Sequence, residues 1–172
     1  MRRVLEESPV IKSNRQSKSL KQILTRARFD DNQNQSTAKI TKCGRPNCGT
    51  CELLIEGESY KFKNGPNLVV KNNMSCASRN LLYVIRCEGC GEDYIGQTGN
   101  ELRKRMTVHK QQIRDPSTRM IPLSGHISDC AKNKAKQFSL FPFYKFREDA
   151  NEQERIVKET DFISKYKPKL NG

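Results

Sequence analysis

The sequence lacks several features that mark common classes of protein. It has no tryptophan, 34% hydrophobic residues and no run of about 18 apolar residues, which excludes a membrane-spanning helix. The first residues, MRRVLEESPVIKSNRQ, contain no apolar stretch of the kind found in a secretory signal, so we expect a nuclear or other intracellular protein. The apolar fraction is low for a self-sufficient core. We therefore expect either an unpacked segment or stabilisation by bound metal.

Acidic residues are also scarce. The chain has 19 aspartates and glutamates against 32 lysines and arginines, a formal net charge of +13. Such an excess indicates a polyanionic partner, and nucleic acid is the default. Histidine is rarer still, with two residues against seven cysteines. In an intracellular chain these cysteines predict metal ligands before disulfides. A disulfide-rich secreted protein is the weakest alternative, because the cysteine count is odd.

The first half of the chain divides into two segments. Residues 1–42 carry ten lysines and arginines against four acids, which predicts a basic, largely flexible arm with a short amphipathic helix over 19–27. This arm is either a remnant of a neighbouring domain or a tail that contacts nucleic acid. Residues 43–80 hold four cysteines among glycine, asparagine and proline. With two short strands, over 59–62 and 67–71, they predict a small metal-tied module.

Residues 81–172 carry the clearest periodic patterns. Three strands are expected over 80–87, 93–98 and 138–146, and two helices over 101–113 and 151–166. Asn100 is the expected N-cap of the first helix, and 114–137 is expected to be a loop. The order of the elements indicates an α+β fold, a small and mostly antiparallel three-stranded sheet flanked by helices.

The cysteines and one histidine divide into two sets of four. One set pairs a C-x2-C turn with an H-x3-C segment, and consists of Cys87, Cys90, His126 and Cys130. The other contains the remaining thiols, Cys43, Cys48, Cys51 and Cys76. Four nitrogen and sulfur ligands are what tetrahedral Zn²⁺ requires, and a closed set leaves no open position for catalysis. We therefore expect one or two structural zinc ions. Thiols without metal are the alternative, and a stronger one for the second set.

Several short motifs follow one another along this second half. Leu81-Leu82-Tyr83 and Tyr94-Ile95-Gly96 lie on the two strands of the expected hairpin. Arg105 and His109 are one turn apart on the following helix, Glu159 lies on the last helix, and Asn171 follows it. This order resembles the GIY-YIG nuclease family, with Leu-Leu in place of its Gly-Ile. The resemblance implies a metal-dependent nuclease domain over 81–172.

A narrower resemblance rests on the cysteine motifs. The segments CGRPNCGTC and SGHISDC look like those of the endonuclease domain of Penelope-like retroelements, which join this nuclease to a reverse transcriptase. The first residues resemble the end of the polymerase part, which implies a C-terminal fragment of such a protein. The sequence departs from that group at Cys130, where a second histidine is common, and cysteine is an equally good zinc ligand.

Five residues are expected to carry the chemistry. Tyr83 would be the base that activates water, although a phenol with a pKa of about 10 must first be made more acidic or pass its proton on. Arg105 would bind the phosphate, and His109 would relay the proton or bind the phosphate. Tyr94 would orient water or pack against the sheet. Glu159, beside an inward stripe containing Ile156, would hold one Mg²⁺ or Mn²⁺.

Four further residues are expected to position the substrate or the site. Gly96 would keep the approach of the substrate clear, and Asn171 would brace the active-site loop or the C-terminus. Arg103 and Lys110 would add phosphate contacts.

The sequence thus predicts a metal-dependent DNA endonuclease that nicks one strand and leaves a 3′-OH primer for retroelement insertion. DNA is the expected partner, with RNA or a reverse transcriptase as further ones. The alternative is a catalytically inactive, zinc-stabilised module that binds nucleic acid.

Overall fold

A computed structural model describes residues 38–63, 65–133, 135 and 137–172 of the chain. In chain order, its strands and helices are β1 (Ser59–Lys61), β2 (Asn67–Val69), β3 (Leu81–Cys87), β4 (Asp93–Thr98), α2 (Leu102–Arg114), α3 (Pro122–Asp129), β5 (Phe138–Lys145) and α4 (Glu152–Tyr166). Short 3-10 turns follow α2 and α4. The basic arm and its expected helix lie outside the described residues, apart from the last few residues of that segment.

The core of the fold is a three-stranded sheet with the order β4-β3-β5, in which both pairings are antiparallel. The expected α+β fold is therefore confirmed. β3 takes the central position because six of its seven residues are buried, and a strand covered on both faces needs a continuous apolar run. Tyr83, in the middle of β3, lies opposite Gly96 of β4 and Pro142 of β5.

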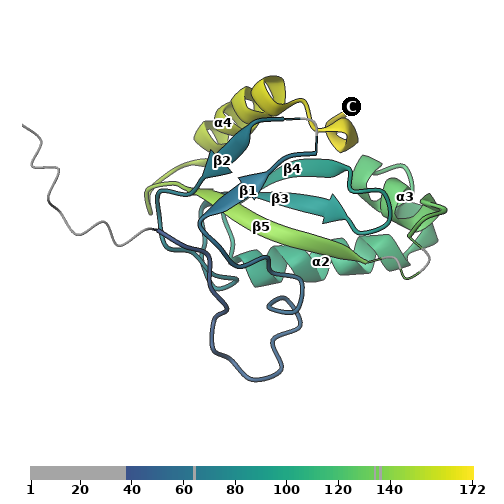
Figure 1. Ribbon diagram of the computed structural model, residues 1–172, viewed down its shortest axis with the longest axis horizontal. Coiled ribbons are helices and arrows are strands. Elements are labelled where there is room, and N and C mark those ends of the chain that lie inside the picture. The colour runs from purple at the N-terminus through teal and green to yellow at the C-terminus, as the bar shows by residue number, and fades with distance from the viewer. Residues whose placement is uncertain (1–37, 64, 134, 136) are drawn as a thin grey trace, which may run out of the picture. The chain divides into compact units, whose positions relative to one another are not determined.

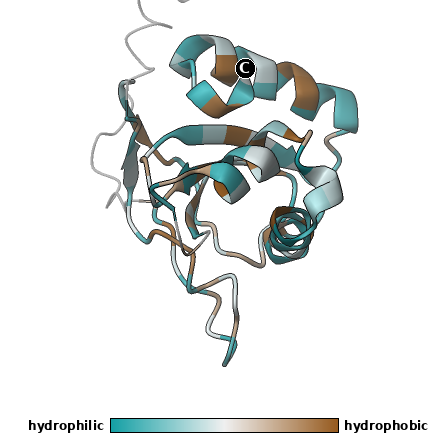
Figure 2. Cartoon of the chain, turned by 90° about the vertical axis from the view of Figure 1, so that its right-hand side faces the viewer, coloured by the Kyte–Doolittle hydropathy of each residue, from teal (hydrophilic) through white to brown (hydrophobic). Residues whose placement is uncertain are grey.

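Helices cover both faces of this sheet, with α2 and α4 on opposite sides (Figure 1; Figure 2). The inward face of α2 consists of Leu102, Met106, His109 and Ile113, all buried. The spacing of three or four residues places them on one side of the helix. α4 packs against the other face through Phe162, whose ring lies 5.0 Å from that of Phe143 on β5. The two helices thus pack their side chains against opposite faces of the sheet.

Residues 38–80 pack onto the same unit as the sheet. The strands β1 and β2 form an antiparallel pair, and Tyr60 of β1 stacks on Phe141 of β5 at 5.1 Å. The Tyr60 hydroxyl also donates to Asp93, which is 3% exposed and pairs with Arg86 at 2.8 Å. A buried carboxylate is stable only when it is paired. Removing one partner of a buried ion pair lowers the free energy of unfolding by about 3–5 kcal/mol.

Three sequence expectations are corrected by the structure. The N-cap of α2 is Glu101 rather than Asn100, whose backbone N–H instead bonds the Thr98 hydroxyl. The expected loop over 114–137 contains α3, an eight-residue helix that begins at Pro122, where the missing N–H costs nothing. Ile156 does not belong to an inward stripe of α4, since it is 39% exposed. No helix in the described part of the chain is long and apolar enough to cross a membrane.

Candidate active site and cysteine clusters

The hydroxyl of Tyr83 lies at the centre of a buried group of polar side chains. Tyr83 is 0% exposed, because β3 is the central strand and α2 covers this face. Its hydroxyl is 2.8 Å from Nε2 of His109 and accepts a hydrogen bond from Nε of Arg105 at 3.1 Å. A residue of the sheet and two residues of α2 therefore meet at one oxygen atom.

The two α2 residues reach this oxygen because they are four positions apart and so share one side of the helix. His109 is 3% exposed and belongs to the packed face of α2, whereas Arg105 lies at its edge and is half-buried. The half-buried Arg105 can therefore contact a substrate from the solvent side. The buried His109 contacts the Tyr83 hydroxyl from inside the protein.

Tyr94 and Gly96 lie on the neighbouring strand and face the same way as Tyr83. The Tyr94 ring is half-buried and meets the His109 ring edge-on at 6.2 Å. A Cβ atom at Gly96 would lie 2.7 Å from the Tyr83 hydroxyl oxygen and 2.8 Å from the Tyr94 ring. Any other residue would push the two tyrosines away. Gly96 thus makes room for the phenol groups themselves, a closer reason for glycine than the expected clearance for substrate.

Glu159 approaches from α4, on the other side of the sheet. α4 packs beside the edge strand β4 (Figure 1), and the Glu159 carboxylate interacts electrostatically with Tyr83, Tyr94 and Arg105. Burial raises the pKa of Glu159, while the Arg105 guanidinium and a hydrogen bond to the Gln97 backbone act in the opposite direction. The structure thus gathers four of the five expected residues around one hydroxyl and brings the fifth, Glu159, within electrostatic range of Tyr83, Tyr94 and Arg105.

Burial also sets the protonation states of Tyr83 and His109. It lowers the pKa of His109 to about 3, helped by the positive charge of Arg105 and opposed by a hydrogen bond to Gln112. Burial likewise raises the pKa of Tyr83 above its ordinary value, against the effect of Arg105. At neutral pH the pair therefore consists of a protonated phenol and a neutral imidazole, and a neutral Nε2 can accept a hydrogen bond from the phenol.

The four expected positioning residues divide between two places. Asn171 lies beside β4, where its amide accepts from the Ile95 N–H and donates to the Ile95 carbonyl, both at 2.8 Å. It thus pairs with the outer edge of β4 as another strand would. Arg103 and Lys110 lie on the outer face of α2 and bond to Glu101 and to the Gly49 carbonyl. The structure does not bring them to the Tyr83 hydroxyl.

Arg155 also organises the site, and sequence reasoning missed it. Its guanidinium donates to the Gln97 side chain at 3.1 Å, to the Ala150 carbonyl at 2.8 Å and to Asn80 at 3.4 Å. Since Arg155 precedes Glu159 by one helical turn, it fixes the same face of α4 against β4. The spacing of four residues from Glu159 was a usable signal.

The seven cysteines and His126 form two clusters. All seven cysteines fall within the described residues, and each is a free thiol. The ligand atoms of Cys43, Cys48, Cys51 and Cys76 lie within 4.8 Å of one another, and so do those of Cys87, Cys90, His126 and Cys130. The two sets are those that the spacing predicts.

The first cluster has the dimensions of a metal site. The Cys51 sulfur lies 3.4 Å from that of Cys76 and 3.5 Å from that of Cys43. These separations are far longer than a disulfide bond of about 2.05 Å. They approach the sulfur–sulfur edge of about 3.8 Å in a tetrahedron with bonds of about 2.3 Å. Cys76 is 0% exposed, and the donor set fits a metal ion that prefers thiolates.

The second cluster joins the β3–β4 turn to α3. The Cys90 sulfur lies 3.2 Å from Nε2 of His126, and the Asn133 amide donates to the Cys87 sulfur at 3.3 Å. A hydrogen bond of this kind orients a ligand sulfur. Gly91 completes the turn with a φ of +72°, a conformation that glycine adopts without strain. This set also fits a metal ion.

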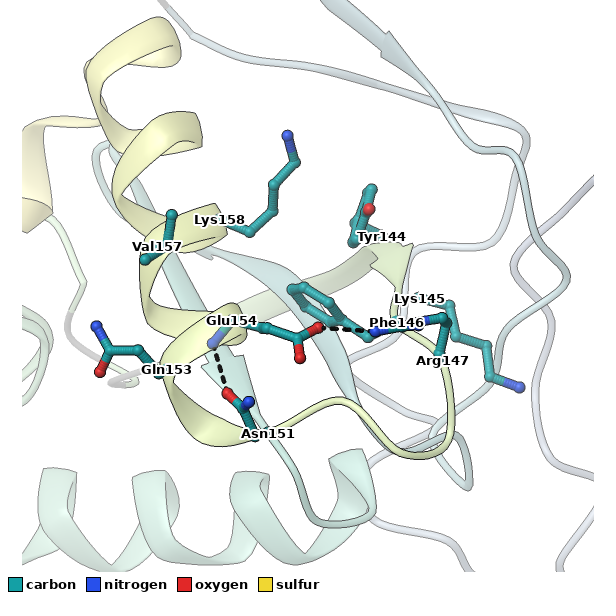
Figure 3. Close-up of a pocket in the computed structure, with 9 residues that line it drawn as sticks. All are labelled: Tyr144, Lys145, Phe146, Arg147, Asn151, Gln153, Glu154, Val157 and Lys158. Atoms are coloured by element: carbon teal, nitrogen blue, oxygen red, sulfur yellow. Dashed lines mark hydrogen bonds and ion pairs between the residues drawn. The ribbon is translucent and has the colours of Figure 1, made fainter.

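A surface hollow lies apart from these residues. It has a volume of about 550 Å³ and lies between the end of β5 and the first turns of α4. Figure 3 shows its lining, with Tyr144 and Lys158 at one side and the N-cap of α4 at the other, where Asn151 accepts from the Glu154 N–H. None of the five expected chemical residues lines it. The candidate site is thus marked by converging polar groups rather than by cavity volume.

Comparison with known families supplies the deciding observation, because the profile of the GIY-YIG catalytic domain matches residues 79–171. The chain belongs to the GIY-YIG family. It therefore carries a nuclease catalytic domain of the endonuclease type, and its substrate is nucleic acid. GIY-YIG nucleases usually use a divalent metal ion. Comparison with curated proteins and with solved structures found no match, so the assignment rests on the GIY-YIG profile and the geometry above.

Proposed function

We propose that the protein is a metal-dependent DNA endonuclease whose reacting groups surround the Tyr83 hydroxyl. The observation that carries this proposal is the contact of that hydroxyl with a neutral imidazole and a guanidinium, within reach of the Glu159 charge. Phosphodiester hydrolysis needs a base for water and positive charge at the phosphate. Each requirement has a residue in this cluster.

Tyr83 takes the proton of the attacking water and passes its own proton to Nε2 of His109. The starting protonation allows this order, because the phenol is protonated and the imidazole neutral before substrate arrives. A pKa of about 3 makes this imidazole a weak base, so the transfer requires the negative charge of the bound phosphate, which would raise the pKa of His109. Arg105 donates to the phosphate and stabilises the phenolate at the same time, since its guanidinium has several donors in a planar fork. Tyr94 lies at the exposed side of the cluster and orients the water.

Glu159 is the residue that would hold Mg²⁺ or Mn²⁺. Its half-buried carboxylate interacts electrostatically with Tyr94 and Arg105, and oxygen ligands suit these ions, with water completing the coordination. When bound, such an ion neutralises charge on the phosphate and on the leaving oxygen. Asn171 and Gly96 keep β4 and the two tyrosines in place around this carboxylate.

The two cysteine clusters would each hold one Zn²⁺ in a structural role. Every ligand position is filled by the protein in a set of four cysteines, or of three cysteines and one histidine, so neither ion has an open position for chemistry. Their role is to fix loops that contain few apolar residues.

We further infer that the enzyme nicks one DNA strand and leaves a 3′-OH. A single site with one catalytic metal acts on one phosphodiester bond, and cutting the second strand would need a second site. The likeness to Penelope-like retroelements supports priming of reverse transcription as the purpose, in the nucleus, with RNA and a reverse transcriptase as partners. That likeness rests on the CGRPNCGTC and SGHISDC segments.

Nicking of supercoiled plasmid with Mg²⁺ or Mn²⁺ tests the proposal. The wild type should convert supercoiled to open circular DNA, whereas Tyr83→Phe and Glu159→Ala should lose about 10²-fold or more of the rate while DNA binding persists. Tyr144→Phe and Glu152→Ala are matched controls on β5 and α4, and should nick normally. Equal nicking by all five proteins would refute the site, and binding without nicking by the wild type would favour the inactive module.

A further inference from the structure

A second feature of the molecule is a basic cleft between the first cysteine cluster and the outer face of α2. It has a volume of about 340 Å³, and one wall is the loop that contains Arg45 and Cys48. The other wall is α2, with Arg103, Lys104 and Lys110. No aspartate or glutamate is among the described residues that line it. Four cations thus line one hollow that no acidic residue lines, and one of them, Arg103, is paired with Glu101.

Three of the five cations of α2 form a straight stripe along the helix. Arg103, Lys110 and Arg114 are 7 and then 4 residues apart, so they fall within about 20° of one line at 3.6 residues per turn. At about 1.5 Å per residue, the stripe is about 16 Å long. That length matches about five base-pair steps of B-DNA at about 3.4 Å each.

Two hydrogen bonds join the segments that carry the first cysteine cluster to α2. Lys110 donates to the Gly49 carbonyl at 2.7 Å. The backbone N–H of Arg103 lies in the first turn of α2 and has no partner within the helix. It donates to the carbonyl of Cys76 at 2.8 Å. The cluster therefore positions α2 directly, and holds Arg45 opposite Lys104 across the cleft.

We propose that this cleft binds the phosphodiester backbone of duplex DNA beside the scissile bond, which makes the first cysteine cluster half of a substrate-binding surface. The inference rests on the proposed nuclease function and adds a binding site to it. α2 has 13 residues, so the cleft and the Arg105–His109 pair are within about 20 Å of each other along one helix. At about 100° per residue, the stripe points about 140° away from this pair around the helix axis. A duplex that reaches the pair would therefore meet the cleft with the part of its backbone that passes over the edge of α2.

The ion pair of Arg103 allows a variant that should strengthen DNA binding, beside the variants that should weaken it. Its guanidinium is held by the Glu101 carboxylate at 2.7 Å, which repels phosphate and occupies part of the donor fork. Glu101 makes no side-chain capping bond to α2, so Glu101→Gln leaves the helix intact. This variant should bind DNA more tightly than the wild type, whereas a merely solvated face would show no gain.

The experiment measures binding of a fluorescent 30-base-pair duplex by anisotropy at 50–200 mM KCl, in the full chain. Arg45→Ala and Lys104→Ala should each bind about fivefold to tenfold more weakly at 0.1 M salt and lower the salt slope by about 1. Arg119→Ala and Lys165→Ala, exposed cations outside the cleft, are the matched controls and should change neither value.

The same variants separate this proposal from the nuclease assignment. Whereas Arg119→Ala and Lys165→Ala should nick at the wild-type rate, Arg45→Ala and Lys104→Ala should nick more slowly at limiting DNA, in proportion to their lost affinity. If their affinity and salt slope match those of the controls, and Glu101→Gln binds no more tightly, the cleft is not a phosphate site even when nicking is normal. If the affinity changes occur in a protein that does not nick, the cleft stands and the proposed chemistry falls.

Discussion

Burial of the Tyr83–His109 pair makes the stability of the protein depend on pH. The pKa of His109 is about 3 in the folded protein and about 6.5 in an unfolded chain. Between these values the unfolded chain binds the additional proton, so the free energy of unfolding rises with pH. The gain is lost as the pH falls from about 6.5 towards 3, at up to about 1.4 kcal/mol per pH unit.

Urea unfolding between pH 4 and pH 7 should therefore give a steeper pH dependence for the wild type than for His109→Gln. Both proteins carry the same cysteine clusters and carboxylates, so the difference between the two curves isolates His109. Parallel curves would contradict the neutral state of the imidazole on which the proposed proton transfer depends.

Gly96 offers a second test on a single residue. An alanine there would place its Cβ 2.7 Å from the Tyr83 hydroxyl oxygen, and forcing a methyl group into a packed site costs about 1–3 kcal/mol. Gly96→Ala should lower the free energy of unfolding by this amount in a thermal or urea melt, and should reduce nicking as the hydroxyl moves away from His109.

The control for this substitution is Gly49→Ala, where the nearest atom to the new Cβ is the Lys110 Nζ at 3.5 Å, an ordinary contact. It should unfold like the wild type. A Gly96→Ala protein of unchanged stability would show that the two tyrosines do not pack over this position as described.

At the scale of elements, the cysteine clusters join turns that have little apolar surface of their own. The second cluster connects the β3–β4 turn to α3, and the first connects a loop to the start of α2. Structural zinc contributes about 10–16 kcal/mol of apparent binding energy in zinc-finger peptides. This is comparable to the whole stability of a domain, about 5–15 kcal/mol.

We therefore expect two zinc ions per chain by elemental analysis, and one each in Cys51→Ser and Cys130→Ser. Removing zinc with a chelator should unfold the protein, as seen by circular dichroism, and adding zinc under reducing conditions should restore the signal. A folded, reduced sample with almost no zinc would refute the metal assignment of both clusters.

All regular elements of the second half except α3 were predictable from the sequence, within one or two residues at each end. The continuous apolar run of β3 and the helical spacing of Leu102, Met106 and Ile113 on α2 are clear patterns in the sequence. α3 was missed because eight residues containing glycine and two serines give too short a pattern. Ile156 was misplaced because α4 packs at the edge of β4, which exposes part of its apolar stripe.

On the scale of the whole molecule, spacing predicted the grouping of the cysteines, whereas the approach of Glu159 was expected only from the resemblance to the GIY-YIG family. Spacing alone separates the two clusters, since each contains a short-range pair or triplet. The position of Glu159 depends on α4 crossing to the opposite side of the sheet from α2 (Figure 2) and on Arg155, which ties α4 to Gln97. Local sequence does not encode such a distant contact. The chemical roles of the five residues remain predictions until nicking is measured.

Both outer strands of the central sheet meet other parts of the chain along their open sides. Asn171 occupies the backbone groups of Ile95 on β4, and residues 53–55 bond to Leu140 on β5. Pro142 removes a further donor from β5. Uncovered strand edges are where chains join one another into aggregates. The short segment that carries Asn171 therefore also guards against self-association, and trimming it should make the protein prone to form oligomers long before the core unfolds.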